Sequence, residues 1–382
     1  MSIVAIAAGG TAGHINPALA LAEELRDRGH DVRFFGTPGR LESRLVPEQG
    51  FPFTGLDVTG FDRERPWTLI SSALKMQRAT NLLRTQFTGA QRPAVAAGFG
   101  AYVELPLGRA AAKLGIPLVL HEQNSVPGLA NKMLARTADT LALTYPAARA
   151  SFEGKLGAAT RVLETGNPVR RLILAPTRIR ARAQLELPED ATVLLVFGGS
   201  LGALHINEAI ARLKDELLAR PNLYILHGTG KRDYQMELET LALTPEQQRR
   251  WRVMEYIDDM GAMLAAADVV LSRAGASSIA EIAARAVPSL LVPYPHATAN
   301  HQAVNARLLV DVGGARMLDD AQLDEPVFSQ ELLALVDEPQ TRAAMRAGLE
   351  GLDARGAAGR LADAVEEAAA RGERAARNGT SA

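Results

Sequence analysis

The sequence predicts an α/β protein made of two doubly wound parallel sheets, and three observations carry that prediction. Short apolar runs alternate with helical stretches along the 382 residues. A glycine-rich loop follows such a run twice, at Gly9–His14 and again at Gly198–Gly202. The chain is also longer than the roughly 250–300 residues at which a single core stops growing. Glycines after a buried strand let backbone amides and a helix N-terminus face an anion. We therefore expect two nucleotide-fold halves facing one cleft.

The candidate strands are mostly continuous apolar runs, as expected for parallel strands covered on both faces. They are residues 3–7, 32–35, 93–97, 117–121, 139–144 and 160–164, followed by 193–197, 223–227, 252–256, 268–272 and 289–292. We expect the first helix to start near Pro17, a favoured first-turn residue, and to end at Gly29. Residues 357–370 read as an alanine-rich helix, and residues 371–382 as a frayed polar tail.

The best domain boundary lies at Thr165–Pro168, where glycine and proline interrupt the pattern and an arginine-rich stretch follows. The predicted domains are residues 1–165, residues 166–356, and a C-terminal helix and tail at residues 357–382. Each of the first two is long enough to bury a core of its own.

Composition excludes several classes of function. The 42 basic and 43 acidic residues leave a net charge of -1, which gives no support for nucleic-acid binding. The chain has no cysteine, so disulfides, thiolate nucleophiles and cysteine-zinc sites are absent. The apolar start lacks the basic flank and length of a signal peptide, and no run reaches the roughly 20 apolar residues of a spanning helix. We expect a cytoplasmic location.

One segment has two interpretations. Between Arg65 and Arg84, apolar side chains alternate with basic ones, and the most prominent apolar residues are Trp67, Leu69, Ile70 and Leu74. That mixture suits a helix lying on an anionic lipid surface. A helix that packs its apolar side on its own domain is the alternative, and the residues alone favour it.

The loops point to a sugar nucleotide by elimination. Neither glycine loop has the G-x-G-x-x-G spacing, and neither second strand ends in the acid that an NAD site needs. A P-loop is missing as well. A third cluster, Ser272–Ser278, precedes a helix that carries Glu281, where a carboxylate suits ribose hydroxyls beside a diphosphate. Simple helix capping by Ser277 and Ser278 is the alternative.

Several segments in one order resemble the MurG family of glycosyltransferases over residues 3–310. They are residues 9–14, 98–102, 121–124, 166–170, 198–203, 257–260 and 274–281. The resemblance implies a GT-B fold and inverting transfer of N-acetylglucosamine from UDP-N-acetylglucosamine to the 4-hydroxyl of the N-acetylmuramoyl unit of lipid I. It also implies a peripheral enzyme on the cytoplasmic face of the cell membrane, an anionic membrane surface as partner, and a cell-wall synthesis complex. The resemblance favours the interpretation of residues 65–84 as a helix that lies on the membrane over a helix that only packs on its own domain.

The resemblance also assigns site residues. His14 matches the general base, with a purely structural loop histidine as the alternative, and Glu122 is a reserve base or orients the acceptor. Tyr102 lies on the acceptor side. The donor side comprises Thr11, Ala12, Gly13, Asn124, Arg170, Ser200, Ile257, Ala276, Ser277, Ser278, Glu281 and Gln302. Among these, Ile257 presents backbone to uracil, Glu281 meets ribose, and Ser200 with Ser278 meets the diphosphate. An interdomain salt bridge is the alternative role for Arg170.

No metal or other cofactor is expected, because no Asp-x-Asp pair follows a strand near these loops. Asp258 and Asp259 are expected to cap a helix instead. The chain departs from the family at Ala12, Leu201 and His301, where glycine, glutamine and an amide are frequent. Two other functions stay open: a different sugar-nucleotide enzyme, such as a glycolipid transferase or a UDP-N-acetylglucosamine 2-epimerase, and a non-catalytic binding protein.

Overall fold

The computed structural model describes residues 1–60, 68–199 and 202–379. The chain divides into two compact units. The N-terminal unit comprises Met1–Arg170 and Arg355–Ala382, and the C-terminal unit comprises Arg171–Ala354. Each contains one sheet whose described strands all pair in parallel, which confirms the α/β class. The sequence predicted boundaries after residues 165 and 356, whereas the contacts divide the chain after Arg170 and Ala354.

In the described residues, the sheet of the N-terminal unit has seven strands in the order β3-β2-β1-β4-β5-β6-β7. The strands are β1 (Ile3–Ala7), β2 (Asp31–Gly36), β3 (Phe53–Gly55), β4 (Val95–Gly98), β5 (Leu118–Glu122), β6 (Thr140–Leu143) and β7 (Arg161–Glu164). The helices are α1 (Ala12–Asp27), α2 (Leu41–Glu48), α3 (Thr68–Gln86), α4 (Glu104–Leu114), α5 (Leu129–Leu134) and α17 (Ala357–Gly379). Short 3-10 turns are η1 (Gly89–Gln91), η2 (Ala135–Thr137), η3 (Pro146–Phe152) and η6 (Ala354–Gly356).

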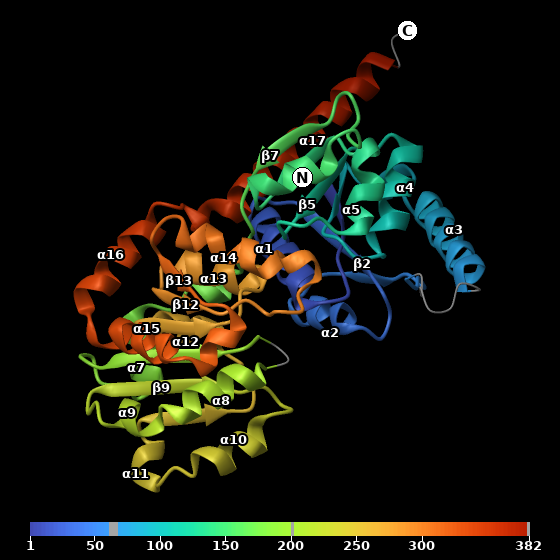
Figure 1. Ribbon diagram of the computed structural model, residues 1–382. Coiled ribbons are helices and arrows are strands. Elements are labelled where there is room, and N and C mark those ends of the chain that lie inside the picture. The colour runs from blue at the N-terminus through green and yellow to red at the C-terminus, as the bar shows by residue number, and fades with distance from the viewer. Residues whose placement is uncertain (61–67, 200–201, 380–382) are drawn as a thin grey trace. The chain divides into compact units, whose positions relative to one another are not determined.

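Helices cover both faces of this sheet. Side chains of α3, α4 and α5 share one buried cluster with alternate residues of the strands, such as Ala5 and Ala7. Side chains of α1 and α17 share the other cluster, with Val4 and Ile6. The red helix α17 therefore completes the first unit, although it ends the chain (Figure 1). Such two-sided cover explains why the strands are continuous apolar runs.

The C-terminal unit has, within its described residues, a six-stranded sheet in the order β10-β9-β8-β11-β12-β13. The strands are β8 (Thr192–Phe197), β9 (Leu223–Gly228), β10 (Trp251–Met254), β11 (Val269–Ser272), β12 (Ser289–Leu291) and β13 (Ala315–Met317). The helices are α6 (Arg171–Leu174), α7 (Arg178–Gln184), α8 (Leu204–Arg212), α9 (Lys214–Leu218), α10 (Tyr234–Leu241), α11 (Pro245–Gln248), α12 (Met260–Ala266), α13 (Ala276–Arg285), α14 (His301–Val310), α15 (Pro326–Asp337) and α16 (Pro339–Glu350), with 3-10 turns η4 (Thr298–Asn300) and η5 (Asp320–Asp324).

Strand order reverses at one point in each sheet, and most of the predicted site loops lie near it. In the first sheet β1 lies beside β4, and in the second β8 lies beside β11. Ligands of open parallel sheets bind outside the carboxyl ends of the strands at such a reversal. The loops after β1, β4 and β5 are therefore neighbours in one unit, as are those after β8 and β11 in the other.

The predicted strands are all present, with ends shifted by up to two residues. The sequence missed β3 and β13, which are three residues long and lie at sheet edges, too short to show a periodic pattern. The expected start of α1 near Pro17 was wrong, because the helix begins at Ala12 and contains Pro17 in its second turn. α17 continues to Gly379, beyond the expected end at residue 370. There Arg371 donates to the Thr140 hydroxyl at 3.0 Å.

Within the described residues, no helix combines the length and apolar character needed to cross a bilayer.

Candidate functional site at the carboxyl ends of the strands

The loop after β1 sets the protonation state of His14. Gly10 has a φ of +85°, which turns the backbone sharply, and Thr11 is the extended residue that precedes α1. The His14 Nδ1 atom lies 3.2 Å from the Gly9 carbonyl oxygen. A carbonyl can only accept, so the neutral imidazole carries its proton on Nδ1 and its lone pair on Nε2.

The surroundings of His14 favour the neutral imidazole. Burial lowers the pKa of His14 below its usual 6.5, and the bond to Gly9 and the charge of Glu122 act more weakly in the opposite direction. The side of the ring that bears Nε2 lies against Gly100, where a Cβ atom would be 3.2 Å from Nε2. At neutral pH the site therefore presents an uncharged nitrogen base beside a glycine.

Three buried glutamates bind the backbone of the loops around His14, and we call Glu42, Glu104 and Glu122 the loop-binding glutamates. Glu42, from α2, accepts the amides of Gly10 at 3.3 Å and Thr37 at 3.0 Å. Glu104, the first residue of α4, accepts the amide of Gly100 at 2.5 Å. These contacts fix the loops after β1, β2 and β4.

Glu122 ends β5 and fixes the next loop. Its carboxylate accepts the amides of Asn124 and Gly128, each at 3.0 Å, and the Asn131 side-chain amide at 2.8 Å. Both carboxylate oxygens are occupied by these donors. Glu122 is thus placed to hold the 123–128 loop, on which Asn124 lies.

In the C-terminal unit, the loop after β11 leads directly into α13. Gly275 precedes the helix, and no side chain caps it, so the capping interpretation of Ser277 and Ser278 was wrong. Both serines lie in the first turn, where helix amides have no intrahelical partner. The Ser277 hydroxyl oxygen is buried and has no hydrogen-bond partner among the described residues. Glu281 lies further along the same helix and is half-buried.

Amide side chains from α14 hold this turn. Gln302 accepts the Ala274 amide at 3.1 Å and the Tyr294 amide at 3.0 Å through its Oε1 atom. Asn305 donates to the Ala274 carbonyl at 3.3 Å. The Oε1 contacts leave the Nε2 group of Gln302 as its donor toward a ligand.

Arg273 connects the same turn to a charged cluster. It donates to the carbonyls of Val292 at 3.1 Å and Pro293 at 3.3 Å, and it pairs with Asp320 at 2.5 Å. His205, in the first turn of α8, contacts Asp320 through Nδ1 at 2.8 Å and Asp324 through Nε2 at 3.2 Å. Burial lowers the pKa of His205, but the bonds to both aspartates outweigh it and raise the pKa. Because both ring nitrogens face carboxylates, the imidazolium form fits this position.

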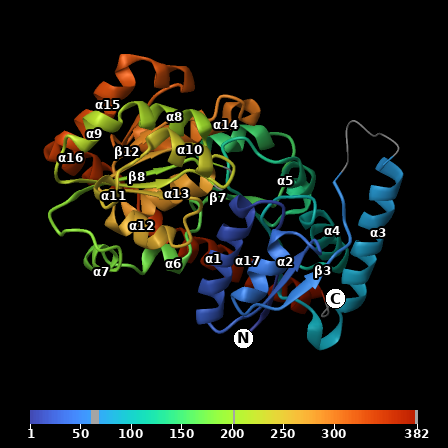
Figure 2. The same ribbon diagram turned by 90° about the horizontal axis from the view of Figure 1, so that it is seen from below.

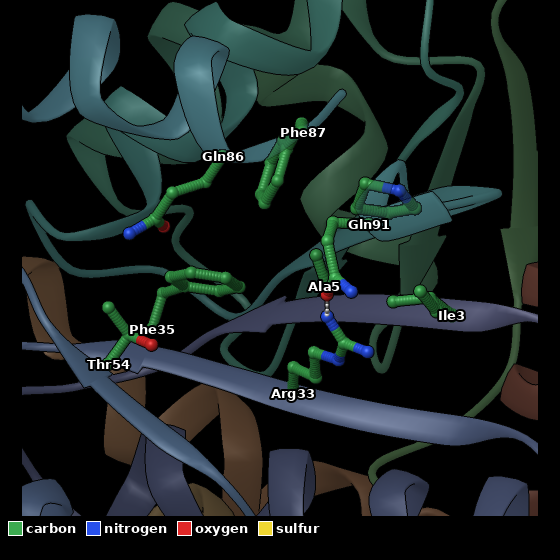
Figure 3. Close-up of a pocket in the computed structure, with 9 residues that line it drawn as sticks. Ile3, Ala5, Arg33, Phe35, Thr54, Gln86, Phe87 and Gln91 are labelled. Carbon is green, nitrogen blue, oxygen red and sulfur yellow. Dashed lines mark hydrogen bonds between the residues drawn. The ribbon is translucent and has the colours of Figure 1, made fainter. Parts of the chain in front are cut away.

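A cavity of about 290 Å³ lies elsewhere in the N-terminal unit, between the first strands and the end of α3 (Figure 3). Arg33, on its wall, is hydrogen-bonded to Gln91. None of the predicted site residues lines this cavity. In the part of the chain that the structure describes, no group of three or more His, Cys, Asp or Glu side chains is arranged to hold a metal ion.

Comparison with known proteins decides the family. Residues 4–143 match the Glycosyltransferase family 28 N-terminal domain, and residues 193–361 match the Glycosyltransferase family 28 C-terminal domain. A Halothermothrix orenii protein is 42% identical over 86% of this chain and 88% of its own length. A Desulforudis audaxviator protein is 38% identical over 97% of this chain and 100% of its own. Both are named UDP-N-acetylglucosamine--N-acetylmuramyl-(pentapeptide) pyrophosphoryl-undecaprenol N-acetylglucosamine transferase.

The crystal structure of Acinetobacter baumannii MurG superposes with a TM-score of 0.69 at 28% identity, covering 96% of this chain and 100% of that one. The chain belongs to the MurG family. The expected GT-B fold class, with two Rossmann-like parallel-sheet domains, is thereby confirmed.

The structure groups the residues predicted from the MurG resemblance within each unit. In the first unit, Thr11 lies in the loop after β1, and Ala12, Gly13 and His14 lie in the first turn of α1. Tyr102 follows β4, Glu122 ends β5, and Asn124 lies in the loop after β5. The Tyr102 ring is 40% exposed and lies against Gly60. In the second, Ile257 follows β10, Ala276, Ser277, Ser278 and Glu281 lie on α13, and Gln302 lies on α14. Ser200 and the departure at Leu201 lie outside the described residues.

Arg170 has partners within its own unit. Its guanidinium donates to Glu23 of α1 at 3.1 Å and to the Gln49 side chain at 2.5 Å. The salt bridge considered as an alternative therefore exists, but its partner Glu23 lies in the same unit as Arg170. The contact of Arg170 with the donor stays a prediction.

Two departures from the MurG pattern have simple local outcomes. Ala12 is the first residue of α1 and does not adopt a positive φ, so alanine fits there without backbone strain. His301 is the first residue of α14. As expected, Asp259 caps a helix, since its carboxylate accepts the Ala262 amide at 2.9 Å.

Sequence reasoning missed Glu42, Glu104 and Asp320, and it included Arg273 in the Ser272–Ser278 cluster without giving it a role. Glu104 comes soon after the 98–102 segment and Arg273 directly follows β11, and those positions were the available signals. Glu42 and Asp320 contact their loops from segments that are distant in sequence, so no local sequence pattern predicts them.

The proposed membrane segment is partly described. Trp67 lies outside the described residues, and Leu69 is the second residue of α3. Ile70 and Leu74 are 73% and 54% exposed, whereas Met76 and Leu83 of the same helix are buried in the core. α3 therefore packs one apolar side on its own unit and exposes other apolar residues.

Proposed function

We propose that this chain transfers N-acetylglucosamine from UDP-N-acetylglucosamine to the 4-hydroxyl of the N-acetylmuramoyl unit of lipid I, giving lipid II and UDP. The names of its curated relatives support this activity. The observation that carries it is His14, whose Nδ1 is held by Gly9 and whose Nε2 is left as a base at the start of α1.

In the proposed step, Nε2 of His14 accepts the proton of the acceptor hydroxyl while its oxygen attacks the anomeric carbon of the donor sugar. The bond between that carbon and the UDP oxygen breaks, so a single displacement inverts the anomeric configuration. A lowered pKa keeps His14 able to accept a proton at neutral pH. Because Glu122 is fully engaged by backbone and Asn131 donors, we assign it to orienting the acceptor loop rather than to proton transfer. Tyr102 lies on the acceptor side.

The proposed donor site uses the start of α13. The first-turn amides, with the hydroxyls of Ser277 and Ser278, meet the diphosphate, and Glu281 accepts the ribose hydroxyls. Ile257 presents backbone to uracil, and the Nε2 group of Gln302 meets a sugar hydroxyl. The remaining contacts are assigned to Thr11, Ala12, Gly13, Asn124, Arg170, Ser200 and Ala276. The negative charge that develops on the departing UDP is stabilised by oriented amides, as in an oxyanion hole.

The test is transfer of labelled N-acetylglucosamine to a short-chain lipid I analogue, with EDTA present and with His14→Ala in parallel. We expect transfer to survive EDTA and kcat of the variant to fall by about 10²–10⁴-fold at unchanged UDP affinity. Loss of transfer with EDTA would refute the metal-free route. A folded protein that binds UDP without transfer would favour a different acceptor or a binding protein.

The structure offers a surface for the proposed contact with the cytoplasmic face of the membrane. α5, α4 and α3 follow one another across one face of the N-terminal unit (Figures 1 and 2). Exposed apolar residues on α3 are Ile70, Leu74 and Leu82, and those on α5 are Leu129 and Met133. Arg78 and Arg84 of α3 are exposed as well. Apolar residues with basic neighbours provide weak docking to anionic lipid.

Binding to anionic liposomes tests this surface. Ile70→Ser with Leu74→Ser is expected to weaken binding while leaving UDP affinity unchanged. Ile179→Ser is the matched control, because Ile179 is 72% exposed on α7 of the C-terminal unit. Equal liposome binding by the double variant and the control would contradict the assignment of α3 to the membrane contact. A cell-wall synthesis complex is a further proposed partner.

A further inference from the structure

Glu104 occupies a buried position directly beneath the turn that borders His14. It is 1% exposed, and its Oε2 atom accepts the Gly100 amide at 2.5 Å. A Cβ atom on Gly98 would lie 2.7 Å from the same oxygen, so the turn closes over the carboxyl group. The Oε1 atom is buried with no hydrogen-bond partner among the described residues. Among the described residues, Glu104 therefore accepts one backbone hydrogen bond, and its donor is the Gly100 amide.

Gly100 in turn lies against the catalytic ring. Its φ is +86°, and the space that a Cβ would fill is 3.2 Å from Nε2 of His14. We propose that Glu104 is a positioning residue for His14: by holding the Gly100 amide, it keeps the 98–102 turn against the ring and so presents Nε2 to the acceptor hydroxyl. This inference rests on the proposed role of His14 as the base.

The number of donors separates Glu104 from the other loop-binding glutamates. Glu42 accepts two backbone amides and Glu122 accepts three donors, whereas Glu104 accepts one. A buried carboxylate needs several donors to remain ionised. Burial accordingly raises the pKa of Glu104 to about 8; the Gly100 amide opposes the rise and the charge of Glu122 adds to it. Glu104 is therefore a neutral acid at pH 7.

The charged groups on neighbouring elements do not offset the raised pKa of Glu104. Glu122, at the end of β5, carries the same sign of charge as an ionised Glu104. On α3, Lys75 is paired with Asp57 at 2.9 Å, and Arg78 is exposed. Lys132 of α5 is half-exposed. His14 lies on the other side of Gly100 and is neutral.

Ionisation of Glu104 is expected to loosen the turn. Above pH 8 the carboxylate is a buried anion with one donor and a like charge nearby, so a turn that opens to water becomes favourable. Nε2 of His14 then loses its fixed position. The wild-type kcat should fall as pH rises through about 8, at constant UDP affinity.

Two substitutions test the proposal through the pH profile of kcat, measured for transfer to the short-chain lipid I analogue. Glu104→Gln keeps an acceptor for the Gly100 amide but cannot ionise. We expect its kcat at pH 7 to stay within about threefold of wild type and its alkaline fall to disappear. Glu104→Ala removes the acceptor, and its kcat should fall at least tenfold at pH 7 with UDP affinity unchanged.

Glu237→Gln is the matched control. Glu237 is also a buried carboxyl whose pKa is raised by burial, to about 7, but it lies on α10 of the C-terminal unit. It should leave the alkaline fall in place. An alkaline fall that persists in Glu104→Gln would overturn the proposal, and this profile decides the matter even where Glu104→Ala does not fold.

A double variant separates this inference from the proposed function. If Glu104 acts through His14, adding Glu104→Ala to His14→Ala should not lower kcat further. An active His14→Ala protein would refute the base itself. An inactive His14→Ala protein, together with wild-type kcat in Glu104→Ala, would refute the positioning role alone.

Discussion

The two units use the same strand–glycine loop–helix arrangement but hold it with different sets of side chains. In the N-terminal unit, carboxyl groups of Glu42, Glu104 and Glu122 accept the amides of the loops. In the C-terminal unit, several side chains around the corresponding loops donate to carbonyls instead, although Gln302 accepts the amides of Ala274 and Tyr294. Asn207 donates to Thr229 at 3.1 Å, Asn305 to Ala274, and Arg273 to Val292 and Pro293.

This difference matches the chemistry proposed for each unit. In the N-terminal unit, carboxyl groups accept the amides of the loops that border His14, and the charge of Glu122 favours a proton on the imidazole. In the C-terminal unit, the first turn of α13 begins with amides that lack an intrahelical partner, which suits a site for an anion. We therefore propose that the two units take different roles through the side chains that hold their loops.

Among variants of the residues around His14, the largest expected effect comes from Gly100→Ala. A methyl group there would lie 3.2 Å from Nε2 of His14, on a backbone with φ +86°. We expect kcat to fall about 100-fold with unchanged UDP affinity, because the base is displaced.

Gly115→Ala is the control for backbone strain alone. Gly115 ends α4 with φ +63° and has open space around it. It should cost about 1–2 kcal/mol of stability and leave kcat unchanged. Equal kcat losses in the two variants would show that strain, and not contact with His14, is responsible.

The next effect should appear in the C-terminal unit. Glu281→Gln replaces the proposed ribose acceptor and is expected to weaken UDP binding about tenfold, as measured by calorimetry. Binding of 2′-deoxy-UDP is the internal control, because it already lacks one hydroxyl. If the variant weakens both ligands equally, Glu281 does not contact that hydroxyl.

A smaller, pH-dependent effect is expected at Asp320. His205 bridges Asp320 and Asp324 as an imidazolium, and those bonds raise its pKa despite burial. The stabilisation of the folded protein by these two contacts of His205 is complete below the ordinary histidine pKa near 6.5. It is lost as pH rises through the raised pKa of His205. Because Asp320 also pairs with Arg273 in the segment before α13, we expect UDP affinity to decline by about threefold over that range, and we expect Asp320→Asn to abolish the decline. A pH-independent affinity in the wild type would contradict the link.

The smallest effect concerns stability. Burial raises the pKa of Glu237 to about 7, above that of an unfolded chain. For an acid, this shift favours folding most below pH 4.5, and the benefit is lost as pH rises to about 7. Glu237→Gln should therefore raise the free energy of unfolding by about 1 kcal/mol at pH 8, which appears as a higher urea midpoint. At pH 4 the free energy of unfolding should not change. A difference that is the same at both pH values would mean that ionisation is not the cause.

Much of the fold was predictable because parallel strands covered on both faces leave continuous apolar runs. Ser277 and Glu281 were singled out by the same logic, because they come soon after such a run, whereas the role of His14 came from the MurG resemblance. The exact start of α1 was not predictable from Pro17, because the turn at Gly10 places the helix start at Ala12. Proline is tolerated in the second turn there.

The supports of the loops could not be predicted. Glu42 and Gly10 are 32 residues apart, and Arg273 and Asp320 belong to different loops, so neither pair leaves a local pattern. Glu104 looks like an ordinary acidic residue in the first turn of a helix. Only its burial beneath Gly98 and Gly100 distinguishes it.

The protonation of His14 is the next measurement to make. Long-range ¹H–¹⁵N spectra of the protein resolve both ring nitrogens, and His14→Gln assigns the signals among the seven histidines. At pH 7 we predict a protonated Nδ1, an unprotonated Nε2 and an apparent pKa below 6.5. An Nε2-protonated or charged ring at pH 7 would contradict the role of His14 as a base and, with it, the division of roles between the two units.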